Sequence, residues 1–107
     1  MTSVFKKNKS DKNKKIMSKF TKGLFWNCNF DELNYLRDKN YIIERIIDAG
    51  AENDEIIMWN TYSYEEIKNV ALNMENLHMD KIVYMSFVLK TKESDFKCYK
   101  KKQWYQK

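Results

Sequence analysis

The sequence predicts an all-α protein: a small single domain of about five short helices with a disordered Lys-rich N-terminus. The first supporting observation is the composition, because the 107 residues include only two Gly and no Pro. An all-β chain with many tight turns normally needs more of both. The second is spacing, since apolar residues recur at helical intervals through most of the chain between residues 24 and 89.

Capping residues place the first two helices. Asn29 is a suitable N-cap for a short helix over 30–35. Asp38 can cap the next helix, over 39–49, in which Ile side chains repeat at helical spacing. Gly50 follows, where the residue after a helix often adopts a positive φ.

A third helix is predicted over 54–62, with apolar side chains on most of its sides. A fourth begins after Ser63, which forms an S-x-x-E capping box with Glu66. One face of this fourth helix carries the apolar residues Ile67, Val70, Ala71 and Met74.

The fifth helix begins at His78 or Asp80 and ends at Leu89. It is apolar on nearly all sides, so we expect it to be the central core helix. The β-branched and aromatic residues of 82–89 also fit a buried strand, which periodicity alone does not exclude. The neighbouring helices and the absence of turn residues favour a helix.

The charge is segregated along the chain, although the formal total is only +5. Residues 1–22 carry a net charge of +7, residues 23–89 a net −7, and residues 90–107 a net +5. A low-complexity Lys-rich segment buries too little surface to fold by itself. The predicted boundaries are a disordered basic tail over 1–16, a helical domain over 17–98, and a basic aromatic tail over 99–107. Met17 is an alternative translation start.

The C-terminal tail is a candidate nucleic-acid-binding segment. It interleaves Lys100, Lys101 and Lys102 with Trp104, a mixture in which Lys neutralises phosphate and rings stack on bases. A solubilising terminus is the alternative interpretation.

Residues for catalysis or metal binding are sparse. His78 is the one His, and Cys28 and Cys98 lie far apart in the sequence, so a zinc site of usual spacing is absent. With no signal peptide, we expect a cytoplasmic protein whose cysteines are both buried thiols. No catalytic residue, metal or cofactor is predicted, and the protein is not expected to be an enzyme. No stretch is long enough to cross a membrane.

Four residues are candidates for binding a protein partner: Phe25, Trp26, Arg45 and Trp59. Trp26 ends a Leu-Phe-Trp cluster that is either core or an anchor for a partner, since Trp concentrates binding energy. Arg45 lies in an Ile-rich helix, where a structural ion pair is the favoured role.

Two blocks of the sequence resemble a bacterial family of small uncharacterised proteins. They are Leu24-Phe25-Trp26-Asn27-Cys28-Asn29 and Tyr41-Ile42-Ile43-Glu44-Arg45-Ile46-Ile47, with Leu33 and Gly50. The family reads roughly L-F-W-D-x-D, then a Leu, then F-I-I-E-R-V-L and a Gly, at matching spacing. The resemblance covers about residues 24–98 and ends near an F-x-C pattern.

Members of this family are commonly described as antitoxin components encoded beside nucleotidyltransferase-type toxins of the abortive-infection class. The resemblance therefore implies an antitoxin-like protein that binds and neutralises such a toxin in a toxin–antitoxin or phage-defence system. The chain departs from the family at residues 74–77, which replace a basic turn, at residues 83–85, and at Asn27, which replaces an Asp.

The predicted partner is therefore a cognate toxin, to which the acidic centre can offer a complementary surface. A small nucleic-acid-binding module using the Lys-rich termini is the alternative function. The sequence predicts no oligomeric state.

Overall fold

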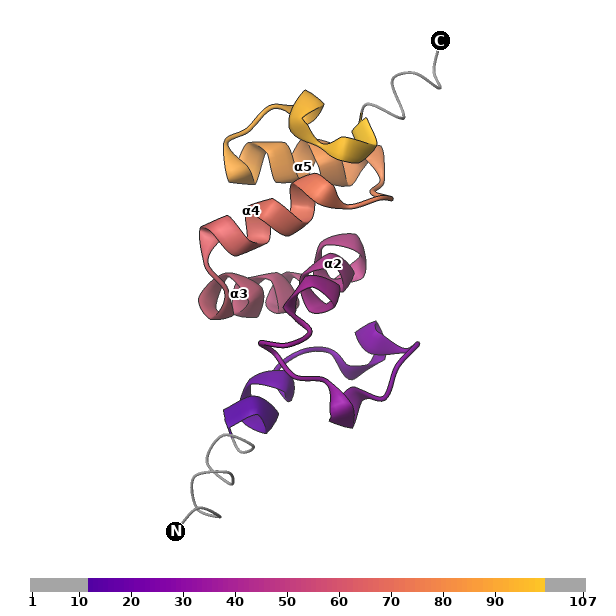
Figure 1. Cartoon of the computed structure of the whole chain (residues 1–107), viewed down its shortest axis with the longest axis vertical. Helices are drawn as coiled ribbons and strands as arrows, with labels where there is room; N and C mark the ends of the chain where they lie inside the picture. Colours follow the sequence, from indigo (N-terminus) through magenta and orange to yellow (C-terminus); the bar gives the residue numbers. More distant parts are fainter. Residues whose placement is uncertain (1–11, 100–107) are drawn as a thin grey trace. The chain divides into compact units, whose positions relative to one another are not determined.

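The computed structural model describes residues 12–99, and every regular element among them is helical (Figure 1). The predicted all-α class is confirmed. The named elements in chain order are η1 (Lys22–Phe25), η2 (Phe30–Glu32), α2 (Lys39–Ala49), α3 (Glu52–Thr61), α4 (Tyr64–Asn73), α5 (Met79–Leu89) and η3 (Glu93–Asp95), where η denotes a 3₁₀ helix.

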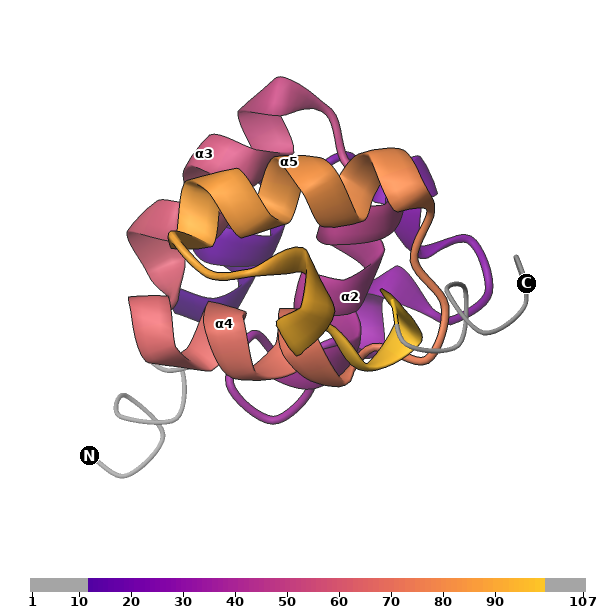
Figure 2. The same cartoon turned by 90° about the horizontal axis from the view of Figure 1, so that it is seen from above.

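The chain forms two compact units that divide between Thr61 and Tyr62. The first contains a helical stretch over 12–17 together with η1, η2, α2 and α3. The second contains α4, α5 and η3; in Figure 2, α4 and α5 lie side by side and the chain after α5 folds back toward them. The single domain predicted over 17–98 stays a prediction.

Helix α2 has the predicted bounds, and its Ile side chains form the core of the first unit. Ile42, Ile43, Ile46 and Ile47 are all buried. Gly50 follows the helix as predicted, but its φ of −70° is not positive. The reason for a glycine here is space, because a Cβ would lie 2.6 Å from the carbonyl oxygen of Ile46.

A buried carboxylate fixes the start of α3. Asp54 is only 1% exposed, and it accepts hydrogen bonds from the backbone N–H of Thr21 at 2.8 Å, the Thr21 hydroxyl at 2.9 Å and the Ala51 N–H at 3.0 Å. The helix begins at Glu52, two residues before the predicted start, and ends at Thr61. Asp54 thus caps the first turn of α3 and ties it to the residue before η1.

The short helix predicted over 30–35 is confined to η2. Asn29 caps it as predicted, through a hydrogen bond from the Asp31 N–H to the Asn29 side chain. Asp38 does not cap α2 with its side chain, because its carboxylate accepts the Asn34 N–H at 2.9 Å instead. The chain leaves the helical conformation at Leu33, and a turn follows over 35–38, so the second half of the predicted helix is absent.

Residues 12–17 are helical, although the sequence assigned 12–16 to a disordered tail. The Asn13 side chain explains the difference, because it donates to the carbonyl of Leu33 at 2.9 Å and accepts the Tyr35 N–H at 2.8 Å. Met17 and Phe20 are buried. Part of the predicted tail therefore belongs to the first unit.

The second unit begins with the predicted capping box. The Ser63 hydroxyl accepts the Glu66 N–H at 3.1 Å, and the Glu66 carboxylate accepts the Ser63 N–H at 2.9 Å. The buried face of α4 carries Ile67, Val70 and Ala71. Helix α4 is thus specified by local sequence, as expected.

Residues 82–89 are helical, which confirms a helix over a strand, but α5 is not a fully buried core helix. One face, with Ile82, Met85 and Leu89, is buried. The other exposes apolar side chains, among them Phe87, which is 82% exposed. The helix ends at Leu89. The next residue, Lys90, has a left-handed φ of 57°, and the Thr91 N–H donates to the Ser86 carbonyl at 2.9 Å.

Replacing Asp54 with Ala should lower the free energy of unfolding by about 2–3 kcal/mol, because the donors of Thr21 lose a charged acceptor in a buried place. Urea denaturation followed by circular dichroism measures this change. Glu52→Ala is the matched control, since Glu52 is exposed in the same first turn and contributes only a helix-dipole term of about 0.3–1 kcal/mol. Equal losses in the two variants would contradict the role assigned to Asp54.

Gly50→Ala should destabilise the protein by about 1–3 kcal/mol, because the new methyl group meets backbone that has no room to move. Gly23→Ala is the control: no atom lies within 4 Å of a Cβ there and no glycine has a positive φ. It should change stability by less than about 1 kcal/mol, in the stabilising direction. Thermal unfolding of both variants compares the two effects.

Candidate protein-binding surface

A turn at residues 22–28 presents an exposed tryptophan. Leu24 and Phe25 in η1 are buried, whereas Trp26 directly after them is 77% exposed. The Leu-Phe-Trp cluster therefore contributes both core and surface.

An aromatic cluster packs around the buried Phe25 ring on the interior side of this turn. The Phe25 ring lies 6.3 Å from Phe20 in an edge-on arrangement, 5.9 Å from Phe30 and 6.1 Å from Tyr41, measured between ring centroids. Such ring pairs add stabilisation beyond the buried area. Phe25 therefore holds the position of the turn from the interior of the first unit.

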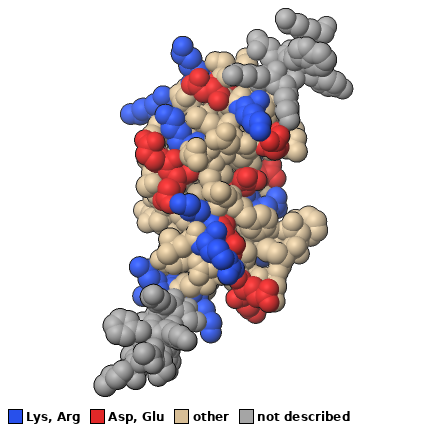
Figure 3. Space-filling view, viewed as in Figure 1, with Lys and Arg blue, Asp and Glu red and all other residues tan. Residues whose placement is uncertain are grey.

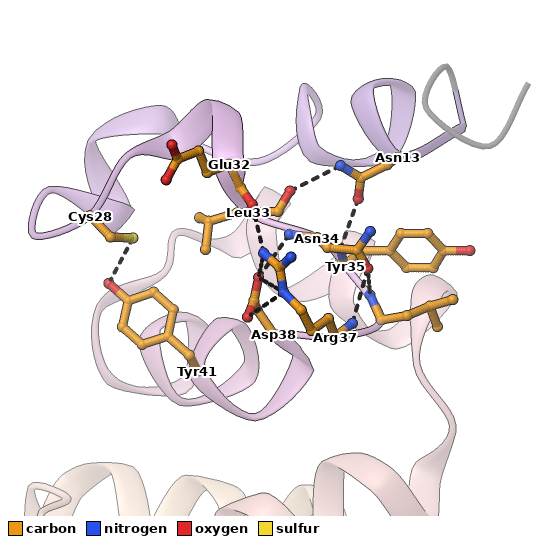
Figure 4. Close-up of polar contacts among 10 residues, drawn as sticks. Asn13, Cys28, Glu32, Leu33, Asn34, Tyr35, Arg37, Asp38 and Tyr41 are labelled. Atoms are coloured by element: carbon orange, nitrogen blue, oxygen red, sulfur yellow. Dashed lines mark hydrogen bonds and ion pairs between the residues drawn. The ribbon is translucent and has the colours of Figure 1, made fainter. Parts of the chain in front are cut away.

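Polar side chains of α2 form hydrogen bonds with the same turn. The Arg45 Nε donates to the Leu24 carbonyl at 3.0 Å. The Tyr41 hydroxyl donates to the Asn27 side-chain oxygen. It also accepts from the Cys28 thiol, with 3.6 Å between sulfur and oxygen (Figure 4). Backbone and side chains on both sides of Trp26 are thus tied to one helix.

The surroundings of Tyr41 change the pKa of its phenol. Burial raises the pKa of the Tyr41 phenol above its ordinary value, and the hydrogen bond with Cys28 raises it further.

The ion pair predicted for Arg45 is present, to Asp48 at 3.3 Å. Cys28 is exposed, contrary to the expectation of two buried thiols, while Cys98 is buried. Cys28 belongs to the surface turn and not to the core.

A hollow of about 270 Å³ borders the turn. It lies between η1 and the ends of α2 and α3 that face it, and the Asp54–Thr21 contact forms part of its wall. Its lining residues are Thr21, Gly23, Leu24, Arg45, Ala49, Ala51 and Asp54. An exposed ring beside a shallow depression is a common arrangement at protein interfaces.

A second loop, over 33–38, carries the exposed side chain of Leu36, which sequence reasoning missed. The Asn34 side chain accepts the N–H groups of Leu36 and Arg37, each at 2.9 Å. Arg37 in turn donates to the Glu32 carbonyl at 2.7 Å and pairs with Asp38 at 2.8 Å. The loop is therefore fixed by its own polar groups and by the Asn13 contacts.

The ion pair in this loop changes the ionisation of Asp38. The hydrogen bond from Arg37 lowers the pKa of the Asp38 carboxyl below its ordinary value, and the Asn34 N–H lowers it further. The charged form of Asp38 is therefore favoured in the folded protein.

The other predicted site residues are less informative. Trp59 is half-buried on α3. Lys100, Lys101, Lys102 and Trp104 lie outside the described residues, so the nucleic-acid interface predicted there stays a prediction. On the face seen in Figure 3, basic and acidic side chains are interspersed.

Within residues 12–99, no three His, Cys, Asp or Glu side chains are grouped so that they could hold a metal ion. None of the helices in this range has the length and apolar character needed to cross a membrane. The described residues that stand out are thus the exposed apolar side chains.

Comparison with known protein families gives a match over about half of the chain. A family of unknown function (DUF6922) matches residues 20–71. The chain is similar to that family over this stretch, which contains the Trp26 turn, Arg45 and Asp54 but not α5. No curated protein and no solved structure matches the chain.

In Asp38→Asn, the melting temperature should fall less steeply with decreasing pH than it does in the wild-type protein. Because the folded pKa of Asp38 is lowered, its carboxylate stabilises the fold above its ordinary pKa of about 4, and this contribution is lost as the pH falls through the lowered value. Melting temperatures recorded from neutral pH into this acidic range measure the slope. Arg37→Gln should also reduce the slope, because it removes the largest cause of the lowered pKa. A wild-type slope in both variants would contradict the assignment.

Proposed function

We propose that the protein is an antitoxin-like binding protein that neutralises a partner toxin of the nucleotidyltransferase type, in a bacterial toxin–antitoxin or phage-defence system. The observation that carries the proposal is the exposed Trp26 on a rigid turn. The function is stoichiometric binding, and no residue is assigned a catalytic role.

The resemblance to antitoxin components rests on two sequence blocks, and these blocks touch each other in the fold. Arg45 from the second block donates to the carbonyl of Leu24 in the first. Tyr41, also in the second block, bonds to Asn27 and Cys28 on the other side of Trp26. The residues that carry the resemblance are thus those that hold the exposed tryptophan in place.

Rigidity favours tight binding at this turn. A turn whose backbone is already held in position loses little conformational entropy when a partner covers it. A large aromatic ring is also the type of residue that most often dominates interface energetics. Trp26 combines 77% exposure with a backbone that is fixed on both sides.

Charge supports a basic partner. Residues 23–89, which contain this surface, carry a net charge of −7. Proteins that act on nucleotides or RNA often present basic surfaces, and opposite charge accelerates association.

The test is co-expression with the neighbouring open reading frame, followed by pull-down and a growth-rescue assay. The wild-type chain should form a stoichiometric complex and restore growth. Trp26→Ala should weaken the complex at least about thirtyfold, the effect of losing an interface hot spot of about 2 kcal/mol. Since Trp26 is exposed, the melting temperature of this variant should stay close to the wild-type value.

Phe87→Ser is the matched control, because Phe87 is an equally exposed aromatic side chain outside the proposed surface. It should retain both the complex and the rescue. No complex and no rescue with the wild-type chain would overturn the proposal, and equal losses in the two variants would remove Trp26 from the binding surface.

A further inference from the structure

A second exposed apolar surface lies on α5, in the second unit. Val83 is 47% exposed, Tyr84 45% and Phe87 82%. At 3.6 residues per turn these three positions share one side of the helix. The opposite side, with Ile82, Met85 and Leu89, is buried. This α5 stripe, defined as Val83, Tyr84 and Phe87, is thus separate from the core.

Two of the three stripe residues lie symmetrically about Met85 in the sequence, whereas the position symmetric to Tyr84 is the buried Ser86. Val83 and Phe87 lie two positions on either side of Met85. Five positions on either side of Met85 are an acid and a base, Asp80 and Lys90, and both are exposed. The apolar stripe is therefore flanked by an acid toward the start of α5 and by a base directly after its end.

We propose that the α5 stripe binds the same stripe of a second copy of this chain, with the two helices antiparallel. A two-fold contact of this kind is self-complementary: if residue i meets residue j, then j meets i. Centred on Met85, it places Val83 of each copy on Phe87 of the other. It also places Asp80 of each copy opposite Lys90 of the other, so the charges at both ends attract.

The ends of the helix are fixed in a way that suits this pairing. The left-handed conformation of Lys90 and the bond from the Thr91 N–H to the Ser86 carbonyl end the helix at a defined point. The Tyr64 hydroxyl donates to the Leu89 carbonyl and anchors the same end. Asp80 lies in the first turn and Lys90 follows the last, so each charge also complements the dipole of its own helix.

This pairing is independent of the proposed function. The α5 stripe lies outside the stretch that matches the family of unknown function and outside the Trp26 turn. The observation that favours a second copy as the occupant is that the exposed acid and the exposed base lie at equal distances from Met85, so an antiparallel copy of the same helix meets both with opposite charge. Self-association accounts for both the apolar middle and the charged ends.

The primary test is sedimentation velocity of the full chain over a range of concentrations. The wild-type chain should show a monomer–dimer equilibrium, and Phe87→Ser should raise the dimer dissociation constant at least about tenfold. Ile56→Ser is the matched control, because Ile56 is an exposed apolar residue of α3 at 52% exposure. It should leave the equilibrium unchanged, and circular dichroism should show that both variants remain folded.

Charge reversal tests the antiparallel geometry. Asp80→Lys and Lys90→Asp should each weaken the dimer, because each single change opposes like charges at both ends of the contact. The double variant should restore dimerisation toward the wild-type level, since the opposite charges then face each other again. High salt should reduce all of these differences.

A wild-type chain that sediments as a monomer at every concentration would overturn the proposal, as would equal effects of Phe87→Ser and Ile56→Ser. Dimerisation without rescue by the double charge reversal would overturn the antiparallel arrangement. If Phe87→Ser loses the dimer but still forms the toxin complex, the dimer contact is supported and is shown to be independent of the proposed toxin binding.

Discussion

The first unit depends on the buried carboxylate of Asp54. A charged group is costly to bury unless donors surround it, and here the backbone and hydroxyl of Thr21 and the backbone of Ala51 supply them. These bonds join the start of η1 to the first turn of α3. With both ends fixed, Arg45 in the intervening helix meets the carbonyl of Leu24, and Trp26 is held outward. One polar contact between residues distant in sequence therefore determines where the candidate surface lies.

The helices were predictable where local chemistry specifies them. The Ile spacing defined α2, and the Ser63–Glu66 box defined the start of α4. The sequence predictions were wrong or incomplete where contacts between residues distant in sequence determine the local structure. Asp54 reads as an ordinary acidic residue of a first turn, because its partner Thr21 is remote in sequence. Gly50 follows a helix, where a positive φ is common, but the close approach of Ile46 is what its missing side chain permits.

The candidate surfaces were predictable only in part. Trp26 and Arg45 stand out by residue type, yet the contact that joins them through Leu24 depends on the fold. Leu36 lies among the polar residues Asn34, Arg37 and Asp38, and that position was the available signal for an exposed loop. In α5, apolar residues on every side concealed which face is covered, because periodicity carries no information when nearly all positions are apolar.

The position of Asn13 has a consequence for alternative translation products. Asn13 lies before Met17, whereas Thr21 lies after it. A chain begun at Met17 would keep the donors that satisfy Asp54 but would lose both side-chain bonds from Asn13 to the loop at Leu33 and Tyr35. Such a chain would also begin at a residue that is buried in the first unit. Residues before Met17 therefore take part both in fixing the Leu36 loop and in the packing of the first unit.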